Sequence, residues 1–222
     1  MPPFTAAAVA RALDHAVLRP EYTSSDLAAH AAMCVNRGVG CICVRPCDVA
    51  AAARLVAGSP VTVASVIGFP HGSHRPETKA LEARLALADG ARELDMVMNI
   101  GRFLSGDHEG VRDDIAAVVA EAKRGGGLVK VILETCFLAP GEIATACRLA
   151  EQAGADFVKT STGYGTDGAT PDAVRIMLDT VGGRLGVKAS GGIRTWDDAV
   201  MYLDMGCTRL GVGDAARILD GA

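Results

Sequence analysis

The sequence predicts one α/β domain over residues 1–222, folded as a closed (β/α)8 barrel of the TIM type. Two observations carry this prediction. Alanine-rich helical segments alternate with compact apolar runs along the whole chain, and polar or glycine residues follow almost every run. Alternating βα units cover a parallel sheet with helices, and a ring of functional loops at the strand ends is typical of barrels. An open doubly wound sheet, the alternative, would concentrate its polar signature at one switch point.

Length and charge exclude several classes of protein. A chain of 222 residues is long enough for one sizeable core, since single domains run to about 250 residues. Its 22 basic and 26 acidic residues give a net charge of −4 without a dense basic cluster, which argues against a nucleic-acid partner. Charged residues interrupt every apolar stretch before it reaches the roughly 18 residues of a membrane span. We therefore expect neither nucleic acid nor membrane as a partner.

Four passages from helix to strand share one pattern, in which an alanine-rich segment ends at a glycine and an apolar run follows. Glycine adopts the left-handed conformation just beyond a helix end without steric cost. The four passages are residues 28–44 through Gly38, 81–98 through Gly90, 143–159 through Gly154 and 199–212 through Gly206.

Further strands are predicted from uninterrupted apolar runs, which are typical of strands buried in a parallel sheet. They are residues 61–67, 128–133 and 185–189, with a short eighth candidate at 12–16. Helix starts are indicated at Thr170 and Thr195, each followed by acidic residues in the first helical turn. Residues 109–124 have the apolar stripe of an amphipathic helix.

The seven cysteines indicate free thiols rather than a disulfide framework, because their number is odd and they are spread through apolar segments. We therefore expect a cytosolic protein, and residues 1–10 lack the basic region of a secretion signal. Cys41, Cys43 and Cys47 are close enough in sequence to raise the question of a metal. No histidine accompanies them and their spacing matches no common zinc pattern, so we expect no metal.

Two lysines at the ends of predicted strands are the first candidates for catalysis. Lys159 and Lys188 each end an apolar run, and small hydroxyl residues and glycine follow both. They are one βα unit apart, which predicts neighbouring strands and side chains at the same barrel mouth. A lone lysine at a strand end would more often extend into solvent. Asp95 lies in an otherwise apolar predicted strand, where a carboxylate is uncommon unless it is paired.

Two lysines and an aspartate in one barrel mouth suit imine chemistry. An amine attacks a carbonyl only when unprotonated, and at the ordinary lysine pKa of ~10.4 about one in 2500 is free at pH 7. A second cation and partial desolvation lower that pKa. Lowering it to ~7 would free about half of the amine, at a differential cost of roughly 4.6 kcal/mol. Asp95 would then relay protons through water.

The motifs of the chain, in order, resemble those of the deoxyribose-phosphate aldolase family over nearly its whole length. The matching segments are LDH at 13–15, LRP at 18–20, VIGFP at 66–70, ELDMV at 93–97, VKVILET at 129–135, FVKTSTG at 157–163 and VKASGGIR at 187–194. Members are class I, metal-free (β/α)8 aldolases that reversibly cleave 2-deoxy-D-ribose 5-phosphate to acetaldehyde and D-glyceraldehyde 3-phosphate.

The resemblance implies a role for each of the three candidates. Lys159 corresponds to the Schiff-base nucleophile, Lys188 to the cation that perturbs its pKa, and Asp95 to the acid that relays protons. The resemblance also implies that Cys43 lies in the pocket wall, that the segment around Leu13 is the short first strand, and that no cofactor is needed. Phosphosugars and aldehydes are the expected small-molecule partners, and a homodimer is plausible for barrels of this kind.

Phosphate recognition is predicted on physical grounds as well. The turn Gly191-Gly192-Ile193-Arg194 precedes the helix capped by Thr195, and such a turn offers backbone N–H groups and a helix dipole to a dianion. The loops after strands seven and eight often bind phosphate in barrels. The turn at Gly163 and the glycine after the last strand, Gly213, are further candidates. Arg194 has an alternative interpretation as an ordinary surface residue.

Asp214 departs from the family pattern, which usually has serine or glycine after the last strand. Two interpretations stay open: Asp214 caps the final short helix and points away, or the preferred acceptor aldehyde lacks a phosphate. The functional alternatives are accordingly the same imine chemistry on a non-phosphorylated acceptor, or a catalytically silent phosphosugar-binding barrel. Paired lysines with Asp95 favour an enzyme over a binding protein.

Overall fold

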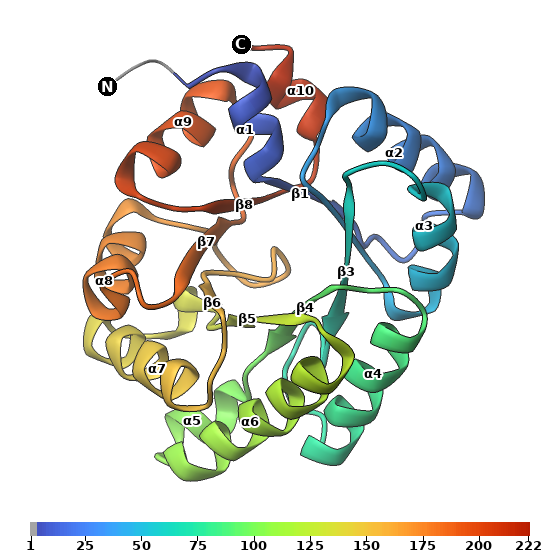
Figure 1. Ribbon diagram of the computed structural model, residues 1–222. Helices are drawn as coiled ribbons and strands as arrows, with labels where there is room; N and C mark the ends of the chain where they lie inside the picture. The colour runs from blue at the N-terminus through green and yellow to red at the C-terminus, as the bar shows by residue number, and fades with distance from the viewer. Residues whose placement is uncertain (1–3) are drawn as a thin grey trace.

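The eight parallel strands form one closed barrel with helices around it, as Figure 1 shows for a computed structural model that describes residues 4–222. Neighbouring strands follow one another in sequence order, and β8 pairs with β1 to close the ring. The predicted (β/α)8 fold class is therefore confirmed, and the open doubly wound sheet is excluded. The predicted domain range of 1–222 includes three residues, 1–3, that lie outside the described part of the chain.

The strands coincide closely with the apolar runs of the sequence, including the short eighth candidate, which is β1. The strands are β1 (Leu13–Val17), β2 (Cys41–Val44), β3 (Thr62–Ile67), β4 (Glu93–Val97), β5 (Leu128–Ile132), β6 (Phe157–Lys159), β7 (Gly186–Ser190) and β8 (Arg209–Val212).

The helices lie on the outside of this ring (Figure 1). They are α1 (Ala6–Ala12), α2 (Ser24–Arg37), α3 (Val49–Leu55), α4 (Pro76–Ala88), α5 (Ile100–Leu104), α6 (His108–Gly125), α7 (Pro140–Gln152), α8 (Pro171–Val181), α9 (Trp196–Met205) and α10 (Ala215–Leu219), with 3-10 turns η1 (Pro46–Asp48) and η2 (Thr135–Phe137). The short helices α1, α3 and α5 were not predicted, because 5 to 7 residues are too few to show a helical period.

The predicted helix boundaries have the expected chemistry. Thr170 accepts a hydrogen bond from the Ala173 N–H at the start of α8, and Thr195 accepts one from the Asp198 N–H at the start of α9. Gly38 has a φ of 66° beyond the end of α2, where its N–H returns to carbonyls of the last turn. These caps end each helix where the chain turns into the next strand.

The apolar core lies between the barrel and the helices, whereas the interior of the barrel is mostly polar. Alternate residues of β5 show this division: Val129 and Val131 belong to the outer core, and Lys130 between them contacts carboxylates inside the barrel. A small interior cluster of Cys41, Cys43, Ala64 and Val66 lines one side. Among the helices of residues 4–222, none has the length and hydropathy needed to cross a membrane.

Candidate active site

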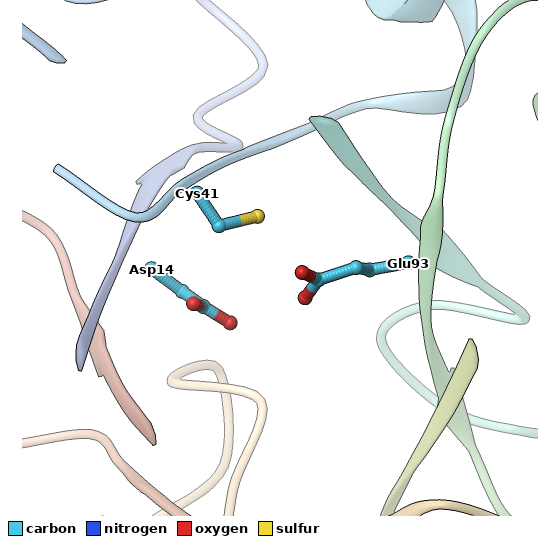
Figure 2. A group of neighbouring side chains, drawn as sticks. All are labelled: Asp14, Cys41 and Glu93. Atoms are coloured by element: carbon cyan, nitrogen blue, oxygen red, sulfur yellow. The ribbon is translucent and has the colours of Figure 1, made fainter. Parts of the chain in front are cut away.

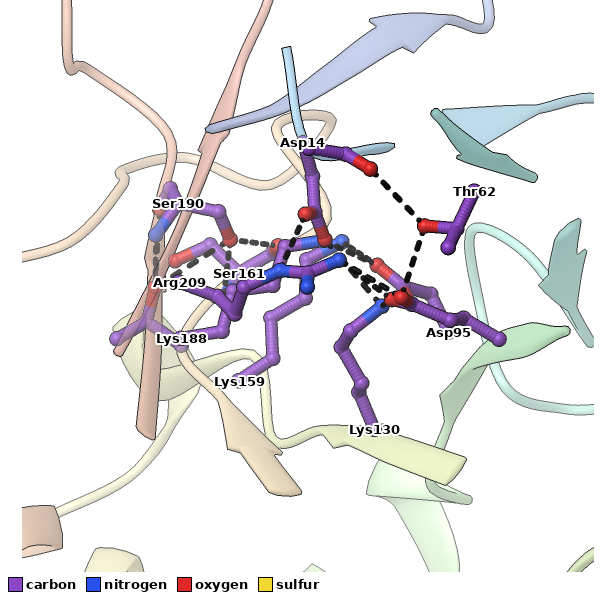
Figure 3. A network of polar contacts seen from close by, with 12 residues as sticks. Asp14, Thr62, Asp95, Lys130, Lys159, Ser161, Lys188, Ser190 and Arg209 are labelled. Carbon is purple, nitrogen blue, oxygen red and sulfur yellow. Dashed lines mark hydrogen bonds and ion pairs between the residues drawn. The ribbon is translucent and has the colours of Figure 1, made fainter. Parts of the chain in front are cut away.

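The three predicted catalytic residues meet inside the barrel (Figure 3). Lys159 at the end of β6 pairs in register with Lys188 on β7, and Asp95 reaches them from β4. The Nζ atoms of Lys159 and Lys188 lie 2.8 Å and 2.7 Å from one oxygen, Oδ2 of Asp95. All three side chains are at most 5% exposed. Neighbouring strands therefore bring the two amines to a single carboxylate, shielded from water.

The two lysines have opposite pKa shifts. Burial lowers the pKa of Lys159 and Lys188 adds repulsion, while the single carboxylate of Asp95 opposes these effects without cancelling them. Burial would also lower the pKa of Lys188, but Asp14 and Asp95 together raise it above the ordinary value. Lys188 is thus a fixed cation, and Lys159 is the amine that loses its proton more easily.

Asp95 is held as a carboxylate. Burial would raise its pKa, but Lys130, Lys159 and Lys188 together hold it well below the usual range. Its two oxygens serve different partners, since Lys130 contacts Oδ1 at 2.9 Å while the other two lysines share Oδ2. A proton taken up by Asp95 during a reaction would therefore be passed on readily.

Beneath these three residues lies a second set of charges that the sequence analysis did not identify. Lys130 Nζ contacts Glu93 and Asp14 as well as Asp95. Arg209 on β8 donates to Asp14 Oδ1 at 2.7 Å and to both oxygens of Glu93. The signal was the one that identified Asp95: each of these residues is charged yet lies within or beside an apolar strand.

Asp14, Cys41 and Glu93 form a group whose ligand-type atoms lie within 4.8 Å of one another (Figure 2). Both carboxylates are already paired with Lys130 and Arg209. Burial, together with the two carboxylates, raises the pKa of the Cys41 thiol well above its usual value. A neutral thiol and two carboxylates bound to cations suit an ion-pair network better than a metal. Cys43 shares β2 with Cys41, but Cys47 lies exposed in η1.

A cavity of about 980 Å³ opens above this network. Lys159, Lys188 and Asp14 line it, whereas the fully buried Asp95 does not. Every residue predicted to bind substrate or phosphate also lines it: Cys43, Gly163, Gly191, Gly192, Ile193, Arg194 and Gly213. Sequence reasoning missed other lining residues, among them His15, Tyr22, His30, Tyr164 and Arg217.

The turn after β7 has the shape expected of a phosphate-binding turn. Gly191 and Gly192 have φ values of 84° and 81°, and a Cβ on Gly191 would lie 2.8 Å from the Cα of Gly168. Glycine is thus required where two loops approach closely. The Arg194 N–H donates to Asp198 Oδ2 at 3.0 Å, which leaves the amides of Gly192 and Ile193 as the candidates for phosphate. The Arg194 side chain is exposed at the rim of the cavity.

Asp214 caps α10, as the milder interpretation predicts. Its Oδ1 accepts the Arg217 N–H at 3.0 Å. The residue nevertheless lines the cavity beside Gly213. The capping part of that interpretation is therefore confirmed, whereas the expectation that Asp214 lies away from the site is wrong, because the residue is part of the cavity lining.

The loop between β6 and α8 folds across the barrel mouth in Figure 1 and is anchored on two sides. Glu134, after β5, accepts the Thr162 N–H at 3.1 Å and also contacts the Thr162 hydroxyl. Its φ of 54° is the one positive value of a non-glycine residue between positions 4 and 222, and the residue lies two positions after the end of β5. Tyr164 donates its hydroxyl to the Leu18 carbonyl and packs edge-on against Phe69. These contacts hold the loop over Lys159.

A histidine pair lies beside the cavity. His15 Nε2 is 2.8 Å from His30 Nδ1, and the Ala215 N–H donates to His15 Nδ1 at 3.3 Å. Burial and His30 lower the pKa of His15 to about 4. His15 is therefore neutral and links β1 to α2 and to the start of α10.

The chain matches known proteins over almost its entire length. Residues 8–210 match the model of the DeoC/LacD family of aldolases. The deoxyribose-phosphate aldolase of Mycolicibacterium paratuberculosis is 51% identical over 222 residues, 98% of each chain. That of Thermococcus gammatolerans is 47% identical over 216 residues, 96% of each chain.

Solved structures agree with these matches in sequence. The tetrameric deoxyribose phosphate aldolase of Aeropyrum pernix superposes with a TM-score of 0.91 at 34% identity, covering 97% of this chain and 91% of the other. A crystal structure of a protein from Coccidioides immitis reaches a TM-score of 0.95 at 38% identity, covering 99% and 87%.

Proposed function

Because this chain belongs to the DeoC/LacD family of aldolases, we propose that it reversibly cleaves 2-deoxy-D-ribose 5-phosphate through a Schiff base on Lys159. The products are acetaldehyde and D-glyceraldehyde 3-phosphate. The observation that carries the residue roles is the shared Asp95 Oδ2, at which one lysine has a lowered pKa and the other a raised one. A phosphosugar-binding barrel without catalytic activity would not require two buried amines with different pKa values.

The reaction begins when the free amine of Lys159 attacks C1 of the open-chain sugar, and water leaves to form the protonated imine. The imine withdraws the electron pair of the C2–C3 bond, which breaks as the C3 hydroxyl loses its proton. C3 to C5 leave as D-glyceraldehyde 3-phosphate, and the pair becomes the enamine of C1 and C2. Protonation at C2 and hydrolysis release acetaldehyde and restore the amine.

Burial suits Lys159 to the attack, because a desolvated amine beside a fixed cation is free more often than an exposed one. Lys188 provides that cation, and its pairs with Asp14 and Asp95 keep it protonated. Asp95 touches both amines and is the group that moves protons between them and a water in the cavity during imine formation and hydrolysis.

We place the phosphate of the substrate at the loops that follow β7 and β8. The amides of Gly192 and Ile193 after β7, with Gly213 after β8, are grouped at the two loops that commonly bind phosphate in barrels. Arg194 adds a cation at the rim, and Gly163 lies in the loop over Lys159. Cys43 belongs to the wall near the reacting carbons; burial raises the pKa of its thiol to about 11, so it stays neutral.

Reduction of the intermediate tests the proposal. Borohydride added with acetaldehyde should attach an ethyl group to one lysine, and peptide mass spectrometry should place it on Lys159. Lys159→Ala should lose the label, while Lys123→Ala, which removes a lysine on α6 outside the cavity, should keep it. A label on another residue of the wild-type protein would contradict the assignment.

We also propose that the protein forms a homodimer and works in the cytosol. Leu81 and Leu85 on α4 are 44% and 55% exposed, and burial between two copies would remove this apolar surface from water. The seven cysteines are all free, as suits a reducing compartment. Light scattering on the purified protein would test the dimer, and a monomer or tetramer would contradict it.

A further inference from the structure

The interior of the barrel contains more cationic groups than carboxylates. Four cationic side chains and three carboxylates contact one another there, so one cation is in excess when all are ionised. The cations are Lys130, Lys159, Lys188 and Arg209, and the carboxylates are Asp14, Glu93 and Asp95. An unbalanced charge is unfavourable in a buried site, so one lysine is under pressure to release its proton.

The pairing within the network identifies Lys159 as that lysine. Lys130 contacts all three carboxylates, Lys188 contacts two of them, and Arg209 contacts two. Among the carboxylates of residues 4–222, Lys159 contacts that of Asp95 alone, and it shares the contacted oxygen with Lys188. Lys159 is therefore the least compensated cation of the set.

Lys130 acts on Lys159 through Asp95. The Lys130 Nζ donates to Asp95 Oδ1 at 2.9 Å, and this is the oxygen that Lys159 does not contact. Glu93 and Arg209 in turn hold Lys130 and Asp14 in place from the other end of the barrel. Without Lys130, the charge of Asp95 would be available to the Lys159 ammonium.

We propose that Lys130, Glu93 and Arg209 are positioning residues that set the charge of the barrel interior, so that the Lys159 amine is the group left without a proton. This inference rests on the proposed function, in which Lys159 is the nucleophile. It adds that a layer of residues remote from the substrate cavity sets the pH at which imine formation begins. None of the three lines the cavity.

The charged and titratable groups around Lys159 in the barrel interior come from six other strands. They are Asp14 (β1), Cys41 and Cys43 (β2), Glu93 and Asp95 (β4), Lys130 (β5), Lys188 (β7) and Arg209 (β8), while β3 carries no charged residue. Burial raises the pKa of both thiols, so they stay neutral. Lys130, Lys188 and Arg209 have raised pKa values, and Asp14 and Asp95 lowered ones. The direction of the shift at Lys159 agrees with the charge count.

The test removes one charge of each sign and follows the pH dependence of borohydride-trapped imine formation with acetaldehyde. The trapping rate rises with pH as Lys159 loses its proton, and we call this rising part of the profile the limb. Lys130→Met removes a cation, so the midpoint of the limb should move to a pH about one unit higher. Glu93→Gln removes an anion, so the limb should move downward by about as much. Each unit is a tenfold change in trapping rate at a fixed pH below the limb.

The double variant Lys130→Met/Glu93→Gln is the matched control, because it removes one charge of each sign and restores the excess of one cation. Its limb should return to within about 0.3 units of the wild type, far less than the single shifts of about one unit. A purely structural role would lower the rate at every pH without moving the limb in opposite directions. Limbs that stay in place, or that move the same way in both single variants, would overturn the proposal.

Arg209 provides a milder test should Lys130→Met fail to fold, because its side chain is 19% exposed at the far end of the barrel. Arg209→Met should move the limb upward, and Arg209→Lys, which keeps the charge, should leave it in place. Equal limbs in these two variants would contradict the inference. Label on a residue other than Lys159 in the wild type would instead contradict the proposed function, so the two failures are distinguishable.

Discussion

Lys159 and Lys188 donate to the same oxygen atom, Oδ2 of Asp95, from adjacent strands of the barrel. One carboxylate oxygen between two ammonium groups compensates neither fully. In the described part of the chain, Lys188 contacts a second carboxylate, that of Asp14, and Lys159 contacts no second one. The difference between Lys159, the proposed nucleophile, and Lys188, the proposed fixed cation, therefore arises from the number of carboxylates within reach of each amine.

Removing the fixed cation should suppress imine formation. In Lys188→Met, Lys159 no longer shares Asp95 Oδ2 with a second ammonium group. The pKa of Lys159 therefore rises, and its amine stays protonated at neutral pH. We expect the trapping rate at pH 7 to fall by about 100-fold, which corresponds to a pKa rise of about two units, and to recover in part above pH 9. A pH-independent loss would contradict this explanation, and Lys188→Arg, which keeps the charge, should shift the profile less.

Replacing the carboxylate should separate imine formation from turnover. Asp95→Asn removes the anion that favours the Lys159 ammonium, so trapping with acetaldehyde should persist to lower pH than in the wild type. Turnover of 2-deoxyribose 5-phosphate should fall by roughly 10² to 10⁴, as expected for the loss of an acid and base catalyst. The variant should also lose about 3–5 kcal/mol of stability, because buried cations lose their partner. Turnover that stays at the wild-type rate in Asp95→Asn would contradict the relay role.

The preference for a phosphorylated acceptor is tested by comparing kcat/KM for D-glyceraldehyde with that for its 3-phosphate in the synthetic direction. We expect the phosphorylated aldehyde to be preferred. Arg194→Met should reduce that preference by about tenfold, because it removes one charged contact to phosphate. Arg175→Met, at an exposed arginine on α8 outside the cavity, is the control and should leave the ratio unchanged. A preference for the unphosphorylated aldehyde in the wild type would favour the alternative function.

The buried His15 makes stability depend on pH. Its pKa is about 4 in the folded protein against 6.5 as the ordinary value, so the unfolded chain binds more protons between these limits. Stability therefore falls as pH decreases from about 6.5 to 4, by about 3 kcal/mol from this residue. Urea unfolding at several pH values should show that the free energy of unfolding falls more steeply between pH 6.5 and 4 in the wild type than in His15→Asn. His71→Asn, at an exposed histidine, should keep the wild-type slope.

Much of the fold could be predicted because strands and helix ends have local signals. The glycines after α2 and α7, Gly38 and Gly154, mark turns into strands by their own backbone freedom. The turn at Gly191 and Gly192, which we propose binds phosphate, was recognisable for the same reason. The short helix α3 was not, because its few residues are alanine-rich without a periodic stripe.

The charge layer beneath Asp95 could not be predicted, because it depends on contacts across the barrel. Lys130 and Asp95 are 35 residues apart, and Lys188 and Asp14 are 174 apart. The sequence shows that each residue is charged within an apolar strand, but only barrel closure between β8 and β1 brings Arg209 to Asp14. Glu134 was missed for a related reason, since its positive φ and its bond to Thr162 have no local signal.

The most direct measurement is the titration of the Lys159 amine itself, by NMR of protein with ¹⁵N-labelled lysine side chains, with Lys159→Ala to assign the signal. We expect the Lys159 signal to titrate below the ordinary lysine value of ~10.4, while the Lys188 signal keeps its proton throughout that range. A Lys159 signal that titrates at or above the ordinary value, or a Lys188 that loses its proton first, would contradict the assignment of nucleophile and fixed cation.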